Sequence, residues 1–404
     1  MIRPSVDMME ALRLTRQGRL QEAMAVLRGA PAAGETSVKR EAEDGTAPVL
    51  DMVPPSMGTG GAWTAPPAGA ASDATQRGDI RPPPPSIPGG FLDRLRKLDI
   101  AGGREGVASR PTKPATVIIP AGARFEIHYF TNEAGSRRYK LYVPSRYTGE
   151  PLPLVVMLHG CTQSPDDFAA GTRMNECAEE QGLLVAYPAQ PSSANPARCW
   201  NWFEGSEQRR GHGEPSLIAG ITRQIVRNFP VESERVYVAG LSAGGAAAAI
   251  MGATYPDLYA AVGVHSGLAC GAARDIPTAF AAMRNGGGPT TRSTPMRKTT
   301  VPTIVFHGDD DKTVNPVNGD QIIAHAKIAM DLKTTVVRGR AAGVSFLRTI
   351  QTDDTGRSML EQWVLQGAGH AWSGGSPAGS FTDPRGPDAS REMVRFFLQH
   401  STRT

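Results

Sequence analysis

Long apolar runs, an excess of charge of one sign and clustered cysteines are all missing from this chain of 404 residues. No stretch reaches the roughly 20 consecutive apolar residues that a membrane-spanning helix needs, so we do not expect an integral membrane protein. Lys and Arg number 43 against 39 Asp and Glu, a formal net charge of +4. A nucleic-acid-binding domain usually concentrates basic residues far more strongly, which argues against a nucleic-acid partner.

The four cysteines, Cys161, Cys177, Cys199 and Cys270, are too few for a disulfide scaffold, and none lies in a C-x-x-C metal motif. Free cysteines are commonly buried, so our main interpretation is reduced thiols in the core. A single bridge between Cys161 and Cys199 is the alternative. The first residues lack the basic start and apolar run that a secretory signal shows in that order, which favours a cytoplasmic protein.

The first 114 residues divide into two parts. Apolar residues at helical spacing within residues 8–29 predict an N-terminal helical segment, residues 1–30. One such unit cannot bury its own apolar face, so it either binds a protein or granule partner or packs on the main domain. Residues 31–114 are predicted to be a disordered linker, because residues 31–90 alone hold eleven Pro and nine Gly. A short amphipathic helix is expected near residues 91–100.

Residues 115–404 have the pattern of one α/β domain, in which short, uniformly apolar runs alternate with helical stretches. Strands that are buried on both faces are uniformly apolar, so these runs predict a mostly parallel central sheet flanked by helices. The expected strands are residues 125–130, 138–143, 154–158, 183–187, 236–239, 261–265, 303–306 and 362–365. The expected helices are residues 166–181, 215–229, 243–255, 316–330 and 388–400.

A G-x-S-x-G motif, Gly240-Leu241-Ser242-Ala243-Gly244, lies directly between an expected strand and an expected helix. This context is typical of a nucleophile elbow, in which a strained turn holds the serine above the sheet. The flanking glycines relieve the crowding of strand against helix. We therefore predict that Ser242 is a nucleophile and that the backbone N–H of Ala243 helps to bind an oxyanion. A Gly-rich helix start with a capping serine is the alternative.

A serine nucleophile needs a histidine base and a carboxylate that orients it, in the order Ser, Asp, His in α/β-hydrolases. His370 lies in a glycine-flanked loop after an expected strand, whereas His325 and His400 lie within expected helices. The predicted base is therefore His370. The predicted acid is Asp311, because residues 307–314 fit the recurrent pattern H-G-x-x-D-x-x-V, with Asp309 as the second candidate.

A second oxyanion donor should come from the loop that follows the strand at residues 154–158. The loop reads His159-Gly160-Cys161-Thr162-Gln163, and the backbone N–H of Cys161 is our choice. Its thiol is given no chemical role. We expect His159 to order the loop.

Three of the five tryptophans, Trp200, Trp202 and Trp372, are expected in loops at the rim of this site, where they would bind substrate or simply pack the loops. The segment His212-Gly213-Glu214-Pro215 is interpreted as a loop that orders the rim. Residues 268–300 read as a flexible basic insertion and a candidate lid.

Five motifs occur in a fixed order within residues 120–400: Leu158-His159-Gly160-Cys161-Thr162-Gln163, Cys199-Trp200-Asn201-Trp202-Phe203, the G-x-S-x-G motif, residues 307–314 and residues 369–375. In these motifs the chain resembles the polyhydroxybutyrate depolymerase family of esterases, which is related to the feruloyl and acetylxylan esterases. The resemblance implies an α/β-hydrolase fold and a triad of Ser242, Asp311 and His370. It also implies ester hydrolysis without a cofactor or metal.

The resemblance leaves several substrates open. Short 3-hydroxyalkanoate esters or polyhydroxybutyrate are favoured, and feruloyl or acetylxylan-type carbohydrate esters are the alternative. Secreted members of the family keep an extracellular location in view. A reading of another class is a non-catalytic protein that binds a granule or partner through residues 8–29 and uses the hydrolase domain as a scaffold.

Overall fold

The computed structural model describes residues 116–287, 301–327 and 331–402. The predicted N-terminal helical segment, the linker and the helix near residues 91–100 lie outside these residues. So do residues 288–300 of the candidate lid.

A ten-stranded mixed sheet forms the centre of the described domain, in the order β1-β2-β4-β3-β5-β6-β7-β10-β9-β8. The six strands from β4 to β10 in that order are parallel, and antiparallel strands extend the sheet at both edges. The strands are β1 (Arg124–Asn132), β2 (Gly135–Val143), β3 (Leu152–Leu158), β4 (Leu184–Pro188), β5 (Val231–Leu241), β6 (Ala261–His265), β7 (Thr303–Gly308), β8 (Lys333–Ala341), β9 (Val344–Thr352) and β10 (Ser358–Leu365). A small parallel pair joins β11 (Trp372–Ser373) to β12 (Thr382–Asp383).

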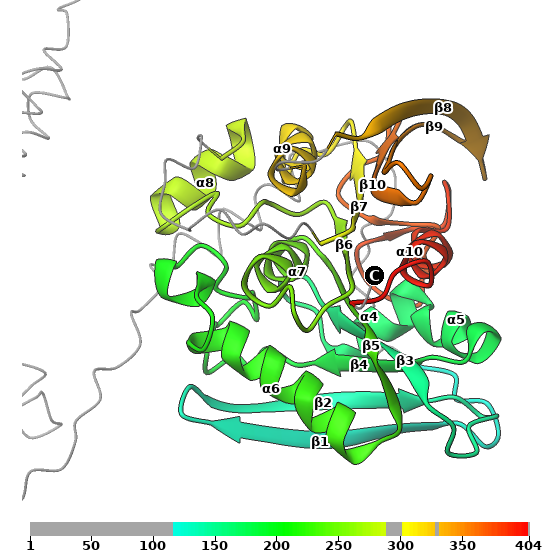
Figure 1. Cartoon of the computed structure of the whole chain (residues 1–404). Helices are drawn as coiled ribbons and strands as arrows, with labels where there is room; N and C mark the ends of the chain where they lie inside the picture. Colours follow the sequence, from blue (N-terminus) through cyan, green and yellow to red (C-terminus); the bar gives the residue numbers. More distant parts are fainter. Residues whose placement is uncertain (1–115, 288–300, 328–330, 403–404) are drawn as a thin grey trace, which may run out of the picture. The chain divides into compact units, whose positions relative to one another are not determined.

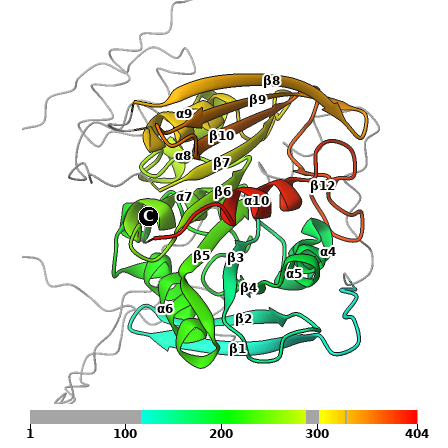
Figure 2. The same ribbon diagram turned by 45° about the vertical axis from the view of Figure 1, so that its right-hand side comes forward.

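Helices cover both faces of this sheet (Figures 1 and 2). They are α4 (Pro165–Thr172), α5 (Met174–Gln181), α6 (Gly213–Asn228), α7 (Ala243–Thr254), α8 (Ile276–Asn285), α9 (Val317–Ala326) and α10 (Ala389–Phe397), with a short 3-10 helix, η2 (Gly205–Gln208). Side chains of α6, α7 and α9 pack on one face, and side chains of α4, α5 and α10 pack on the other.

Strand β3 shows why the apolar runs predict this architecture. Leu154 and Val156 point into the apolar cluster with α6 and α7, whereas Val155 and Met157 point into the cluster with α4 and α10. Successive side chains of a strand point to opposite faces, so burial on both faces requires every residue to be apolar.

Three expected elements differ from the structure. Residues 213–215, which we interpreted as part of a loop, form the first turn of α6, with His212 at its N-cap. The helix predicted over residues 166–181 is two helices, α4 and α5, because Arg173 adopts a left-handed conformation (φ 58°) that ends one and begins the next. The candidate lid, which we expected to be flexible, contains the ordered helix α8. Asp275 caps this helix in a reciprocal capping box with Thr278, and its buried Ala279, Ala282 and Met283 anchor it.

Candidate active site

Ser242 occupies a strained turn between β5 and α7. Its backbone has φ 57° and ψ −120°, a conformation that side-chain-bearing residues rarely adopt. The turn is held by a backbone hydrogen bond of 2.9 Å from the Ser242 N–H to the carbonyl of His265 at the end of β6. The serine therefore lies at the carboxyl edge of the parallel strands, where open α/β sheets bind their ligands.

The glycines of the G-x-S-x-G motif are required by close backbone contacts. A methyl group on Gly244 would lie 1.9 Å from the carbonyl oxygen of Leu158, and one on Gly240 would lie 2.3 Å from the carbonyl oxygen of Gly244. Any larger residue would push α7 away from β3. The start of α7 can thus approach the loop that follows β3.

The loop after β3 runs beside the serine. A methyl group on Gly160 would lie 3.7 Å from Cβ of Ser242. Gly160 itself donates its N–H to Oε1 of Gln163 (2.9 Å). The Gln163 side-chain amide then donates to Asp167 (2.9 Å) and to the carbonyl of Ser380 (3.0 Å), which anchors the loop to α4 and to the segment before β12.

Hydrogen bonding within this loop singles out one backbone donor. The N–H of Thr162 donates to the Ala197 carbonyl (2.6 Å), and the N–H of Gln163 donates to the Gly160 carbonyl (3.4 Å). The N–H of Gly160 is taken by the Gln163 side chain. Among the described residues, therefore, the N–H of Cys161 has no acceptor in the loop's own hydrogen-bond pattern. Ala243, the first residue of α7, also lies where helix N–H groups lack intrahelical acceptors.

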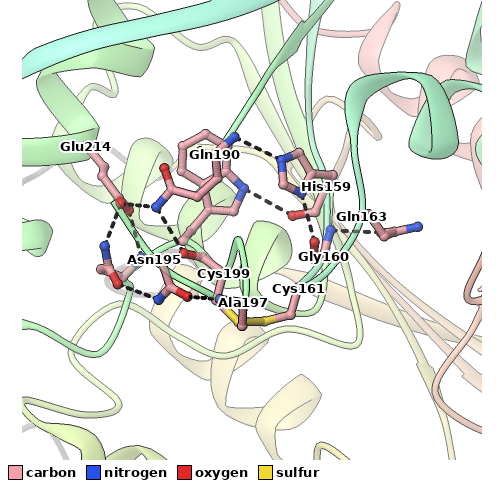
Figure 3. Close-up of a disulfide and its surroundings, with 11 residues drawn as sticks. His159, Gly160, Cys161, Gln163, Gln190, Asn195, Ala197, Cys199 and Glu214 are labelled. Atoms are coloured by element: carbon pink, nitrogen blue, oxygen red, sulfur yellow. Dashed lines mark hydrogen bonds between the residues drawn. A yellow bond between two sulfur atoms is a disulfide. The ribbon is translucent and has the colours of Figure 1, made fainter. Parts of the chain in front are cut away.

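Cys161 forms a disulfide with Cys199, with the two Cα atoms 4.2 Å apart (Figure 3). Our main interpretation, that the cysteines are reduced, is wrong for this pair, and the alternative pairing is the one observed. The reason is that Ala197 accepts a hydrogen bond from the residue after Cys161, which brings the two segments side by side. Cys177 and Cys270 are free thiols.

The structure brings Asp311 and His370 together from the loops that follow the neighbouring strands β7 and β10. Nδ1 of His370 donates to Oδ2 of Asp311 at 2.7 Å, since a carboxylate can only accept. The other carboxylate oxygen accepts the backbone N–H groups of Thr313 (2.9 Å) and Val314 (2.8 Å). Burial alone would raise the pKa of Asp311, but His370 and the hydrogen bonds from both histidines, His307 and His370, hold it below its usual range.

The two carboxylates next to Asp311 have other partners. Asp309 accepts the backbone N–H of Gly367 at 2.6 Å, and Asp310 pairs with Lys312 on the surface. Asp309, the second candidate, therefore tethers the loop that carries His370, whereas Asp311 contacts the imidazole itself.

His265, to which we assigned no role from the sequence, links the serine turn to the histidine loop. Its carbonyl accepts the Ser242 N–H, and its Nε2 accepts the backbone N–H of Ser373 at 3.1 Å. The ring is fully buried and stacks on Trp372, with ring centroids 5.2 Å apart. In the sequence His265 is marked only as the last residue of an expected strand, and its contacts with the two loops are not evident there.

Lowering the pH is expected to destabilise the protein through His265. Burial, assisted by the nearby charges of His307 and His370, lowers the pKa of His265 to about 3. The unfolded chain binds this proton below about pH 6.5 and the folded chain does not, so stability is lost as the pH falls from 6.5 toward 3. At pH 5 this loss amounts to about 2 kcal/mol.

Urea unfolding at pH 7 and pH 5 measures this loss. We expect His265→Gln, whose side-chain oxygen can still accept the Ser373 N–H, to lose less stability between the two pH values than wild type does. His159, whose pKa burial lowers to about 4, contributes equally in both proteins. Identical losses in the two proteins would contradict the assignment to His265.

The expected tryptophan platforms are not at the rim. Trp200 and Trp372 are fully buried, and Trp202 is 6% exposed. The indole of Trp200 donates to the His159 carbonyl (3.1 Å), and that of Trp372 donates to Ser390 (3.1 Å). The expected position at the rim is wrong, because the loops fold inward. The burial agrees with the alternative interpretation, in which these rings pack the loops.

Neither a metal cluster nor a membrane span is found within residues 116–287, 301–327 and 331–402. No three His, Cys, Asp or Glu side chains there are arranged to hold a metal ion. None of the helices described is long and apolar enough to cross a bilayer.

The amino-acid sequence also matches a known protein family. A sequence model described as "Esterase PHB depolymerase" matches residues 137–343, which is 207 of the 404 residues. The matched interval contains Cys161, Ser242 and Asp311 and ends before His370.

Several curated proteins are similar to the chain. It is 29% identical to "Poly(3-hydroxyalkanoate) depolymerase C" of Paucimonas lemoignei over 256 residues, 60% of this chain and 60% of that protein. It is 32% identical to "Feruloyl esterase B" of Neurospora crassa over 140 residues, 34% and 46% of the two chains. It is 28% identical to "Probable acetylxylan esterase A" of Aspergillus clavatus over 186 residues, 46% and 58%. The matches thus span about half to three-fifths of these relatives.

Among solved structures, "Acetyl xylan esterase from Aspergillus awamori" superposes with a TM-score of 0.51 at 22% sequence identity. The superposition covers 68% of this chain and 99% of that one. At this identity the similarity concerns the fold alone, and it agrees with the α/β-hydrolase fold that the motifs predict.

Proposed function

Because the chain belongs to the esterase PHB depolymerase family, we propose that it is a serine esterase that cleaves carboxylic esters through an acyl-enzyme. The observation that carries this proposal is the 2.7 Å hydrogen bond from His370 to Asp311, at the sheet edge where the strained turn presents Ser242. A base oriented by a buried carboxylate beside a serine elbow is the arrangement that serine hydrolysis requires.

In the proposed mechanism, Oγ of Ser242 attacks the ester carbonyl carbon while Nε2 of His370 takes its proton. Nδ1 keeps its own proton because Asp311 accepts a hydrogen bond from that N–H group, which fixes the tautomer. The tetrahedral intermediate then expels the alcohol, which receives the proton from His370, and leaves an acyl group on Ser242. Water, deprotonated by the same imidazole, attacks the acyl carbon, releases the carboxylic acid and restores the serine.

The negative charge of the tetrahedral intermediate needs preorganised donors. We assign this role to the backbone N–H groups of Cys161 and Ala243. The commitment of the neighbouring N–H groups of Gly160 and Thr162 elsewhere supports the choice of Cys161. Each such donor contributes about 3 kcal/mol to lowering the barrier.

For the substrate we propose short 3-hydroxyalkanoate esters or the corresponding polyester. The similarity to a poly(3-hydroxyalkanoate) depolymerase over 60% of the chain supports this class. The burial of Trp200, Trp202 and Trp372 also supports it, because these rings are not available to stack on a sugar or ferulate ring. Feruloyl or acetylxylan-type esters are the second candidate, favoured by the similarity to esterases with those names.

Purified full-length protein can be tested with p-nitrophenyl butyrate, 3-hydroxybutyrate dimers and trimers, methyl ferulate and acetylated xylo-oligosaccharides. We expect the highest kcat/KM among the natural-type substrates on the hydroxybutyrate oligomers. A higher value on methyl ferulate or acetylated xylo-oligosaccharides would transfer the assignment to the second candidate. No turnover of any ester would support the scaffold reading, in which residues 8–29 recruit a granule or protein; those residues lie outside the part of the chain that the structure describes.

The disulfide also supports a proposal for the cellular compartment in which the protein works. Disulfides persist in oxidising surroundings and are rare in the cytoplasm. The bridge between Cys161 and Cys199 therefore favours the extracellular alternative over the cytoplasmic location that we first expected.

A further inference from the structure

The loop that carries the Cys161 N–H is fastened to an irregular segment, residues 195–201. The disulfide joins Cys161 to Cys199, and the Thr162 N–H donates to the Ala197 carbonyl (2.6 Å). Residues 195–201 form neither helix nor strand. Hydrogen bonds of Asn195 to Asn201, Ala197 and Arg198 shape the segment from within, and hydrogen bonds to other parts of the chain hold it in place. The position of the Cys161 N–H, the proposed oxyanion donor, therefore depends on the position of residues 195–201.

One buried carboxylate accepts several of the hydrogen bonds that hold the segment. Glu214, in the first turn of α6, accepts the backbone N–H of Asn201 on Oε2 (2.7 Å) and the side-chain amide of Asn201 on Oε1 (2.8 Å). The amide of Gln190 also donates to Oε1 of Glu214 and, in addition, to the carbonyl of Cys199 (3.0 Å). Figure 3 shows how the contacts lead from Glu214 through Gln190 to Cys199 and across the disulfide to Cys161.

The electrostatic surroundings show that this carboxylate is not a surface charge. Its side chain is 7% exposed, and Nη2 of Arg137 on β2 lies 3.7 Å from its Oε1. Glu207 of η2 accepts the backbone N–H of Glu214 (2.5 Å). Burial and the charge of Glu207 raise the pKa of Glu214 to about 7, against the hydrogen bonds from Asn201 and Gln190 and the charge of Arg137. Burying a carboxylate is costly unless its donors are fixed in place.

We propose that Glu214 is a positioning residue of the esterase: by fixing Gln190 and Asn201 on either side of Cys199, it sets, through the disulfide, where the Cys161 N–H meets the oxyanion. The inference rests on the proposed function, because it concerns the transition state of that reaction. Glu214 has no contact with the substrate in this role. Replacing Glu214 should therefore change kcat and leave substrate binding largely unchanged.

Glu214→Gln tests the role with little change in shape. A carboxylate accepts on both oxygens, whereas an amide accepts on one and would direct its NH₂ group at a donor of Asn201 or Gln190. We expect kcat for p-nitrophenyl butyrate to fall about 10- to 100-fold, the cost of a small misplacement of catalytic groups, with KM changed less than twofold. Butylboronic acid, which forms a tetrahedral adduct on serine, should bind more weakly by the same factor as kcat/KM.

Glu361→Gln is the matched control. Glu361 is also buried and accepts hydrogen bonds from Arg348 and Arg395, but it joins β9, β10 and α10. We expect this variant to lower the unfolding midpoint while kcat and boronate affinity stay at the wild-type values. Equal kcat losses in the two variants would mean that any buried defect slows the enzyme, and would overturn the proposal.

A double-mutant cycle tests the route through the disulfide. In a Cys161→Ala/Cys199→Ala background, Glu214→Gln should lower kcat by a much smaller factor than in wild type. The same factor in both backgrounds would overturn the proposal. If Glu214→Gln does not fold, Gln190→Ala takes its place, and wild-type kcat and boronate affinity in that variant would overturn it too.

Variants of Ser242 and Glu214 separate the proposed function from the proposed role of Glu214. Turnover that does not depend on Ser242 would overturn the proposed function and this inference with it. Turnover that depends on Ser242 but is unchanged by Glu214→Gln would overturn the inference alone.

Discussion

Alanine in place of Ser242 is expected to lower kcat for p-nitrophenyl butyrate by about 100,000-fold or more. The variant keeps the turn but loses the only atom that can form the acyl-enzyme at this position. What remains is the small catalysis that oxyanion donors and binding supply to attack by water. Because alanine is smaller than serine and lies in the same turn, the fold should persist, and the unfolding midpoint should stay within a few degrees of wild type.

Ser266→Ala is a suitable control for this measurement. Ser266 follows the neighbouring strand β6, is buried and also has a left-handed backbone (φ 49°). Its Oγ lies 3.2 Å from Nδ1 of His265, so it belongs to the same region without being a candidate nucleophile. We expect it to retain activity within about tenfold of wild type. A Ser242→Ala protein that keeps more than about 1% of wild-type kcat would exclude Ser242 as the nucleophile.

The sequence predicts the centre of this fold and the edge formed by β1 and β2, but it does not predict the opposite edge, formed by β9 and β8. The uniformly apolar run at Leu154–Leu158 is typical of a strand buried on both faces, and β3 is such a strand. No strand was predicted over β8 and β9, which form an antiparallel hairpin in which β8 is the exposed edge strand and β9 is mostly half-buried. Residues 333–338 of β8 are all exposed, so no hydrophobic pattern marks them.

The sequence likewise predicts some features of the candidate site and not others. Asp311 and His370 follow neighbouring parallel strands, and the carboxyl ends of such strands meet at one edge, so topology alone predicts that the two loops are close. The direction of a side chain within a loop is not encoded in this way. Trp200 and Trp372 lie in the right loops but point inward, and the contacts of Glu214 and His265 become visible only in three dimensions.

Asparagine in place of Asp311 is expected to lower kcat by about 1,000- to 10,000-fold. Its side-chain oxygen can still accept the N–H groups of Thr313 and Val314, so the loop should keep its shape. Its NH₂ group would then face Nδ1 of His370, and the ring would have to turn that nitrogen into an acceptor. The proton would move to the nitrogen that must act as the base, so the base would be blocked although every backbone contact remains.

Asp309→Asn separates this effect from a general loss of charge in the loop. Asp309 accepts the Gly367 N–H, and an asparagine oxygen at this position could accept it too. Its kcat should stay within about tenfold of wild type. The Asp311→Asn variant should regain part of its activity at high pH, where hydroxide can replace the missing base. Equal losses in Asp309→Asn and Asp311→Asn would contradict the assignment of Asp311, since Asp311 is the carboxylate that accepts the hydrogen bond from Nδ1 of His370.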